Sequence, residues 1–298
     1  MGTFVGHFVP GLALTILGLW HIINTIRSYY LKGPSNFISK FWYPFNNSLL
    51  KLKELELILI LSFSVLAIIL QVLDYPAFHL SFKLDNFEHA TMFIHLAIFT
   101  GFAYYAESDQ ISESVSSLVG IMAASVFGQE LFLLHFHSTD HVGLEGQYHG
   151  LLQLIVLVSF LAAVAMTVFP ASFPAALVLS VSVVFQGCWF VNMGFMLWVP
   201  KLIPKGCFPQ MDKAGSSEMM HGAVTCGSPE ADFRARALAN LQFSWILAGI
   251  LMFTGVSSMI LARKGVPRIW QLTAYEQLQN RKSESPVTIE CFKQPLDH

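Results

Sequence analysis

The chain has 298 residues, of which 54% are hydrophobic and 12% are charged, and its mean hydropathy is +0.56. Because about a quarter of the residues of an ordinary soluble domain are charged, this composition excludes a disordered chain and argues against a soluble enzyme. The formal net charge of -2 carries no basic signature for nucleic acid, so we expect no nucleic-acid partner.

Apolar segments of membrane-spanning length follow one another along most of the chain. A spanning helix needs roughly 20 mostly apolar residues. The segments that meet this requirement are about 4–28, 54–73, 87–106, 113–136, 148–169, 174–199 and 236–261. Since a helix satisfies its backbone hydrogen bonds internally in lipid, the sequence predicts an all-α bundle of seven transmembrane helices within residues 1–262. A polar tail at 263–298 follows it.

The positions of lysine and arginine predict the orientation of this bundle. The loop after the first span and the tail after the seventh are rich in cations, whereas between Lys53 and Lys201 the only cation is Lys83. By the positive-inside rule, both cation-rich segments face the cytosol. With seven spans, the N-terminus is then exoplasmic or luminal and the C-terminus is cytosolic.

The predicted exoplasmic loop at 200–235 contains Cys207 and Cys226. An oxidising compartment allows such a pair to form a disulfide, and two unpaired thiols are the alternative. Cys188 in the sixth span and Cys291 in the tail are expected to be unpaired.

Histidines are concentrated on the predicted exoplasmic half of the protein. Of the 11 histidines, all but His21 and His298 fall there. Ionisable groups in membrane spans are costly and are hypotheses for function by default. His21 is interpreted as a structural residue near the first cytosolic interface, where Trp20 and Tyr43 are typical of an aromatic belt.

The densest polar group lies around the junction of the fourth and fifth predicted spans. Its members are Glu130, His137, His141, Glu145 and His149. The last four follow at intervals of four, and helical neighbours at that spacing lie about 5–6 Å apart at Cβ, close enough for two imidazoles to share a metal ion. Gly143 and Gly146 suggest a turn that folds the fifth span back and brings His149 towards His137.

Imidazoles and a carboxylate in tetrahedral reach suit zinc best, with iron or copper as further candidates. His89, which opens the third predicted span, is an additional candidate ligand. Two other interpretations stay open. The histidines and carboxylates could form a hydrogen-bonded network at a helix–loop junction, or they could sense protons, because imidazole titrates near pH 6.5.

Three segments resemble a known family. They are the start of the chain, with Phe4, Gly6-His7, Pro10-Gly11 and Gly18-Leu19-Trp20; the run from Gln186 through Trp189-Phe190 to Gly194-Phe195; and the series Glu130, His137, Glu145, His149. Together they resemble the transmembrane protein 45 family, also catalogued as domain of unknown function 716, and the phrase at 136–146 is similar to its plant branch. The resemblance implies a seven-span protein of Golgi-, lysosome- or vacuole-like endomembranes or of the plasma membrane. It also implies an association with stress or defence responses, and no agreed biochemical activity.

The leading hypothesis is a multi-pass membrane protein in contact with the lipid bilayer, with a zinc-binding site on its luminal half. As an enzyme, it would hydrolyse a lipid-like ligand entering from the leaflet, with a metal-bound water as nucleophile and a spare carboxylate as base. The alternative is a non-catalytic protein of stress or defence response that senses pH or binds partners. Ion or metal transport is a third possibility. It would need polar residues that continue across the bilayer, and the cytosolic halves of the spans contain few beyond His21.

Overall fold

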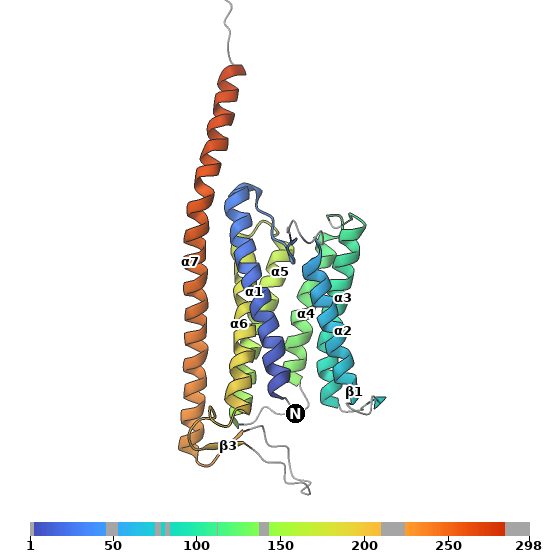
Figure 1. Ribbon diagram of the computed structural model, residues 1–298, viewed down its shortest axis with the longest axis vertical. Helices are drawn as coiled ribbons and strands as arrows, with labels where there is room; N and C mark the ends of the chain where they lie inside the picture. The colour runs from blue at the N-terminus through green and yellow to red at the C-terminus, as the bar shows by residue number, and fades with distance from the viewer. Residues whose placement is uncertain are drawn as a thin grey trace, which may run out of the picture.

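The computed structural model describes residues 3–45, 53–74, 79–80, 84–111, 113–136, 143–209 and 224–283; for 74, 79–80, 85 and 264–283 it describes the backbone alone. These residues form an all-α bundle, as predicted (Figure 1). Its helices are α1 (Phe4–Lys32), α2 (Leu55–Val72), α3 (Leu84–Ser108), α4 (Ser116–Phe136), α5 (Gly143–Val168), α6 (Phe173–Trp198) and α7 (Pro229–Ser283). The short elements are η1 (Pro34–Asn36), β1 (Leu73–Asp74), β2 (His79–Leu80), β3 (Cys207–Pro209) and β4 (Val224–Cys226).

Among the described residues, six helices are long and apolar enough to cross a membrane: α1, α2, α4, α5, α6 and α7 up to Arg263. The chain is therefore an integral membrane protein whose outer surface contacts lipid. The third predicted span corresponds to α3, which is not one of these six and carries Glu88, His89 and His95. It is nevertheless part of the bundle, because it packs against α2 and α4.

Local sequence signals explain where several helices begin and end. Thr3 caps the start of α1 by accepting a hydrogen bond from the Gly6 amide at 3.0 Å, and Gly33 ends that helix with a φ of 79°. Ser172 caps α6 in the same way through the Ala175 amide at 3.3 Å, with Pro174 in the first turn. These residues provide hydrogen-bond partners for backbone groups at the helix ends, while the apolar stretches between the ends cross the bilayer.

Each helix packs mainly against one or two others. α1 packs against α6, α6 against α5, α5 against α4, α4 against α3, and α3 against α2. α7 lies along α1, α5 and α6 and projects beyond them at its C-terminal end (Figure 1). The closest pair, α1 and α6, meets through glycines: a Cβ on Gly11 would lie 2.8 Å from the backbone nitrogen of Val191. Small residues at such contacts are typical of membrane helices, where packing drives association.

The core lies where α1, α5 and α6 meet. Ile22, Tyr148, Trp189 and Met193 are fully buried there, and the indole nitrogen of Trp189 donates to the Tyr148 carbonyl at 3.0 Å. The outward-facing sides of the helices are apolar as well, for example at Trp245 on α7, which is 76% exposed. An apolar surface of this kind is what a lipid environment requires.

The helix α7 extends beyond the predicted last span, 236–261, at both ends. α7 runs as one helix from Pro229 to Ser283 and so continues into the predicted polar tail. Before it, β3 and β4 pair in antiparallel register with Cys207 opposite Cys226, and a disulfide joins these two residues. This hairpin lies at the end of the bundle where α7 starts and where the N-terminus is found (Figure 1).

Candidate functional site

Two histidines from helices far apart in the sequence meet at the N-terminal end of the bundle. His7 lies in the first turns of α1 and His149 in the second turn of α5. Their ring centroids are 6.2 Å apart, and their planes are nearly perpendicular at 78°. His7 is 6% exposed and so lies inside the protein, while His149 is partly buried.

Both imidazoles are oriented by the backbone one turn before them. Nδ1 of His7 donates to the Thr3 carbonyl at 3.0 Å, and Nδ1 of His149 donates to the Glu145 carbonyl at 3.0 Å. Because a carbonyl oxygen can only accept, Nδ1 carries the proton and Nε2 carries the lone pair of the neutral ring. His95 on α3 has the same arrangement with the Thr91 carbonyl at 3.0 Å.

The surroundings of His7 hold its ring in place. The ring stacks on Trp198 of α6, with centroids 4.4 Å apart, and Phe190 lies 5.9 Å away. His89 at the start of α3 is close enough to interact electrostatically with His7. This end of the bundle therefore combines imidazoles from α1, α3 and α5 with aromatic side chains of α6.

The structure describes only part of the predicted ligand set. His137 and His141 lie outside the described residues, while Glu130, Glu145, His149 and His89 lie within them. Within the part of the chain that the structure describes, no group of three or more His, Cys, Asp or Glu side chains could hold a metal ion. The described neighbour of His149 among the histidines is His7, which is not among the predicted ligands. In the sequence, the one sign that His7 and His149 could be neighbours is that His7 lies at the start of the first span, on the same predicted side of the membrane as His149.

Glu130 points towards a different helix. Its Oε1 atom accepts a hydrogen bond from Nε2 of Gln186, which lies on α6 and is 2% exposed. The other polar atom of that amide, Oε1 of Gln186, is buried and has no partner among the described residues. Gln186 belongs to one of the segments that carry the family resemblance, but no spacing in the sequence predicts its pairing with Glu130.

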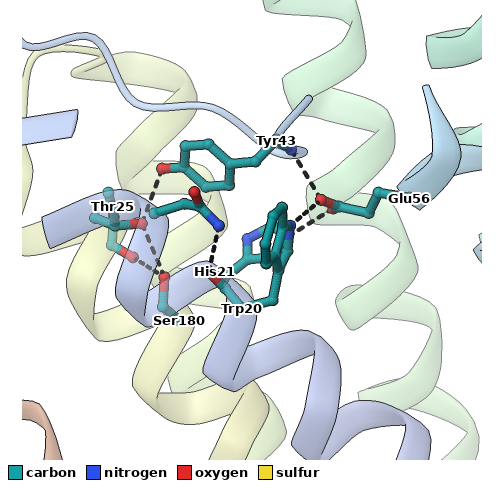
Figure 2. A network of polar contacts seen from close by, with 8 residues as sticks. Trp20, His21, Thr25, Tyr43, Glu56 and Ser180 are labelled. Atoms are coloured by element: carbon teal, nitrogen blue, oxygen red, sulfur yellow. Dashed lines mark hydrogen bonds and ion pairs between the residues drawn. The ribbon is translucent and has the colours of Figure 1, made fainter. Parts of the chain in front are cut away.

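A second polar cluster lies towards the opposite end of α1 (Figure 2). Glu56, in the first turn of α2, is 7% exposed and accepts three hydrogen bonds. The donors are the indole nitrogen of Trp20 at 2.8 Å, Nε2 of His21 at 2.7 Å and the backbone amide of Tyr43 at 2.9 Å. The sequence interpretation of Trp20, His21 and Tyr43 as interfacial residues misses the carboxylate that they surround.

This cluster extends into the bundle through hydroxyl groups. The Tyr43 hydroxyl is hydrogen-bonded to Thr25 at 2.9 Å, and Thr25 to Ser180 at 3.3 Å (Figure 2). Burial raises the pKa of Tyr43 to about 12, so its hydroxyl stays neutral. The network joins α1, α2, α6 and the segment before α2, and its carboxylate is fully engaged. We therefore interpret it as structural.

Part of the chain matches a known protein family. Residues 116–259 match the model of a family described as a family of unknown function, DUF716. The matched range runs from the start of α4 into α7 and so contains Glu130, Glu145, His149 and Gln186. His7 and Glu56 lie before it.

Proposed function

We propose, from the premise that the chain belongs to the DUF716 family, that it is an integral membrane protein which binds a transition-metal ion, zinc by preference. The site is at the end of the bundle where α1 and α5 begin. The observation that carries this proposal is the pairing of His7 with His149, each with Nδ1 bound to a backbone carbonyl.

That hydrogen-bonding pattern is the one that metal-binding histidines show. A ligating imidazole almost always donates its other ring N–H to a carbonyl, carboxylate or water, which fixes its orientation and strengthens the donor nitrogen. His7 and His149 both meet this condition. The aromatic stack of His7 on Trp198 adds a rigid apolar wall.

The separation of the two rings is near the value that a shared ion requires. With Zn–N distances of about 2.0–2.1 Å in a tetrahedral site, the centroids of two ligating imidazoles lie about 5 Å apart. The observed 6.2 Å exceeds this by about one ångström, which small side-chain rotations can supply. His137 and His141 remain predicted as further ligands, and Glu145 lies one turn before His149.

The chemistry that such a site would perform is metal-assisted hydrolysis of a lipid-like substrate. A metal held by His7 and His149 would lower the pKa of a bound water and so would supply a nucleophile. Glu145, a 9% exposed carboxyl group on α5, would be the base. Because the site lies at one end of a bundle with apolar outer faces, an amphiphilic substrate could reach it from the adjoining leaflet.

The test is the metal content of detergent-purified protein prepared without chelator or histidine tag, measured by mass spectrometry. We expect about one zinc per chain in the wild type and loss of the metal in His7→Ala and in His149→Ala. His95→Ala is the matched control, because His95 has the same backbone anchor on a different helix. A folded wild type without stoichiometric metal would overturn the proposal and favour a hydrogen-bonded or pH-sensing group.

A further inference from the structure

The contact between Glu130 and Gln186 lies inside the bundle. Glu130 belongs to α4, which packs chiefly against α3 and α5, and Gln186 belongs to α6, which packs chiefly against α1 and α5. The hydrogen bond from Nε2 of Gln186 to Oε1 of Glu130 therefore ties together two spans that are not direct neighbours.

The amide of Gln186 is only half satisfied. Its nitrogen donates to Glu130, but its oxygen is the one buried side-chain nitrogen or oxygen atom that lacks a partner among the described residues. Most buried polar atoms in folded proteins have a partner, so each exception calls for a physical explanation. An ionised Glu130 cannot be the missing donor to this oxygen, because a carboxylate has no proton to donate.

Glu130 also lacks a neighbouring positive charge. Among the described residues, Glu130 takes part in neither the His21–Glu56 nor the Arg236–Asp232 ion pair, and its hydrogen bond is to the neutral amide of Gln186. An unpaired carboxylate in a membrane span is costly.

The titratable side chains on the helices around Glu130 are engaged elsewhere. On α4, His135 is hydrogen-bonded to Gln153. On α3, His95 is bound to the Thr91 carbonyl, while Glu88 and His89 lie at the start of the helix. On α5, Tyr148 donates to Gln242, and Glu145 and His149 lie near the helix start. On α6, Cys188 accepts from Thr15.

We propose that Glu130 is a proton-binding site within the membrane span, held as a neutral carboxylic acid that donates its proton to Oε1 of Gln186. The acid and the amide then form a closed pair with two hydrogen bonds, one in each direction. A single proton removes both anomalies: the buried acceptor gains a donor, and the span loses an uncompensated charge. Exchanging the oxygen and nitrogen of the amide gives no alternative, because a carboxylate would then face an acceptor.

Infrared spectroscopy of the purified protein in detergent tests this directly. At neutral pH we expect one carbonyl band of a protonated carboxylic acid that moves to lower frequency in deuterated water and is absent from Glu130→Gln. Glu56→Gln is the matched control, because the Glu56 carboxylate already accepts three hydrogen bonds, and it should leave the band unchanged. A folded wild type without such a band, or a band that persists in Glu130→Gln, would overturn the proposal.

A second variant, Gln186→Met, tests the pairing even if Glu130→Gln does not fold. Gln186→Met has a similar volume but donates no hydrogen bond, so the carbonyl of a neutral Glu130 becomes free and its band moves to higher frequency. An unchanged band in Gln186→Met would contradict the pairing. Metal content tests the histidine pair separately, through His7→Ala and His149→Ala, whereas the infrared band tests Glu130 alone.

Discussion

Glu56 of α2 and Trp20 of α1 are joined by a 2.8 Å hydrogen bond from the indole nitrogen to a carboxylate oxygen. Trp20 is about 20 Å further along α1 than His7, given a rise of 1.5 Å per residue. Since α1 packs chiefly on α6 and α2 chiefly on α3, this carboxylate connects two parts of the bundle that are otherwise joined mainly through α4 and α5.

The first prediction concerns that carboxylate. Glu56→Gln replaces one acceptor oxygen by an NH2 group that faces existing donors, so we expect a loss of about 1.5–3 kcal/mol in the free energy of unfolding, the range for hydrogen bonds to charged groups. Thermal unfolding in detergent measures this loss. Glu113→Gln, at an exposed position, should leave the melting temperature unchanged. Equal stability of both variants would show that the network does not hold α2 to α1.

Packing between α1 and α6 gives the second prediction. A Cβ on Gly18 would lie 2.5 Å from the backbone nitrogen of Val184, and a backbone cannot move aside as a flexible side chain can. Gly18→Ala should therefore destabilise the protein by about 1–3 kcal/mol, as overpacking usually does. Gly101→Ala is the control, because a Cβ there would meet no atom within 4 Å. The comparison requires both melting curves in the same detergent, and a stable Gly18→Ala would contradict the close approach.

Much of the fold follows from the sequence because each membrane helix is a local property of the chain. Apolar length predicts α6 at 174–199, and the helix observed is Phe173–Trp198, with Ser172 and Pro174 marking its start. The end of α7 is not predictable in this way. Polar residues after Arg263 end the apolar stretch that can cross lipid, but they do not end a helix, so α7 continues to Ser283.

The polar sites are less predictable because their partners come from different helices. The sequence predicts a turn at Gly143 and Gly146 and a fifth span from about 148, whereas α5 begins at Gly143 and already contains Glu145, whose carbonyl orients the ring of His149. The neighbour of His149 on α1, His7, depends on the order in which helices pack. The same holds for Gln186 with Glu130 and for Glu56 with Trp20, since periodicity within one segment carries no information about a partner in another.

The third prediction follows from the raised pKa of Tyr43. Its usual value is 10.0, and burial raises the pKa to about 12 in the folded protein. A group whose folded pKa is raised stabilises the fold fully below its unfolded pKa, and this contribution is lost as the pH rises through the folded value. Stability should therefore fall between about pH 10 and pH 12, and Tyr43→Phe should reduce that dependence. Unfolding curves across this window test it, and an identical fall in both proteins would contradict it.

The last prediction concerns the disulfide between Cys207 and Cys226, which are 19 residues apart in the sequence. Closing a loop of this size restricts the unfolded chain and stabilises the fold by about 3 kcal/mol in the chain-entropy model. A reducing agent should therefore lower the melting temperature of the wild type and leave that of Cys207→Ser unchanged. Cys188→Ser is the matched control, because Cys188 is a free thiol on α6 and its removal should preserve the sensitivity to reduction. A wild type that melts at the same temperature with and without reductant would mean that the hairpin before α7 holds together without the covalent link.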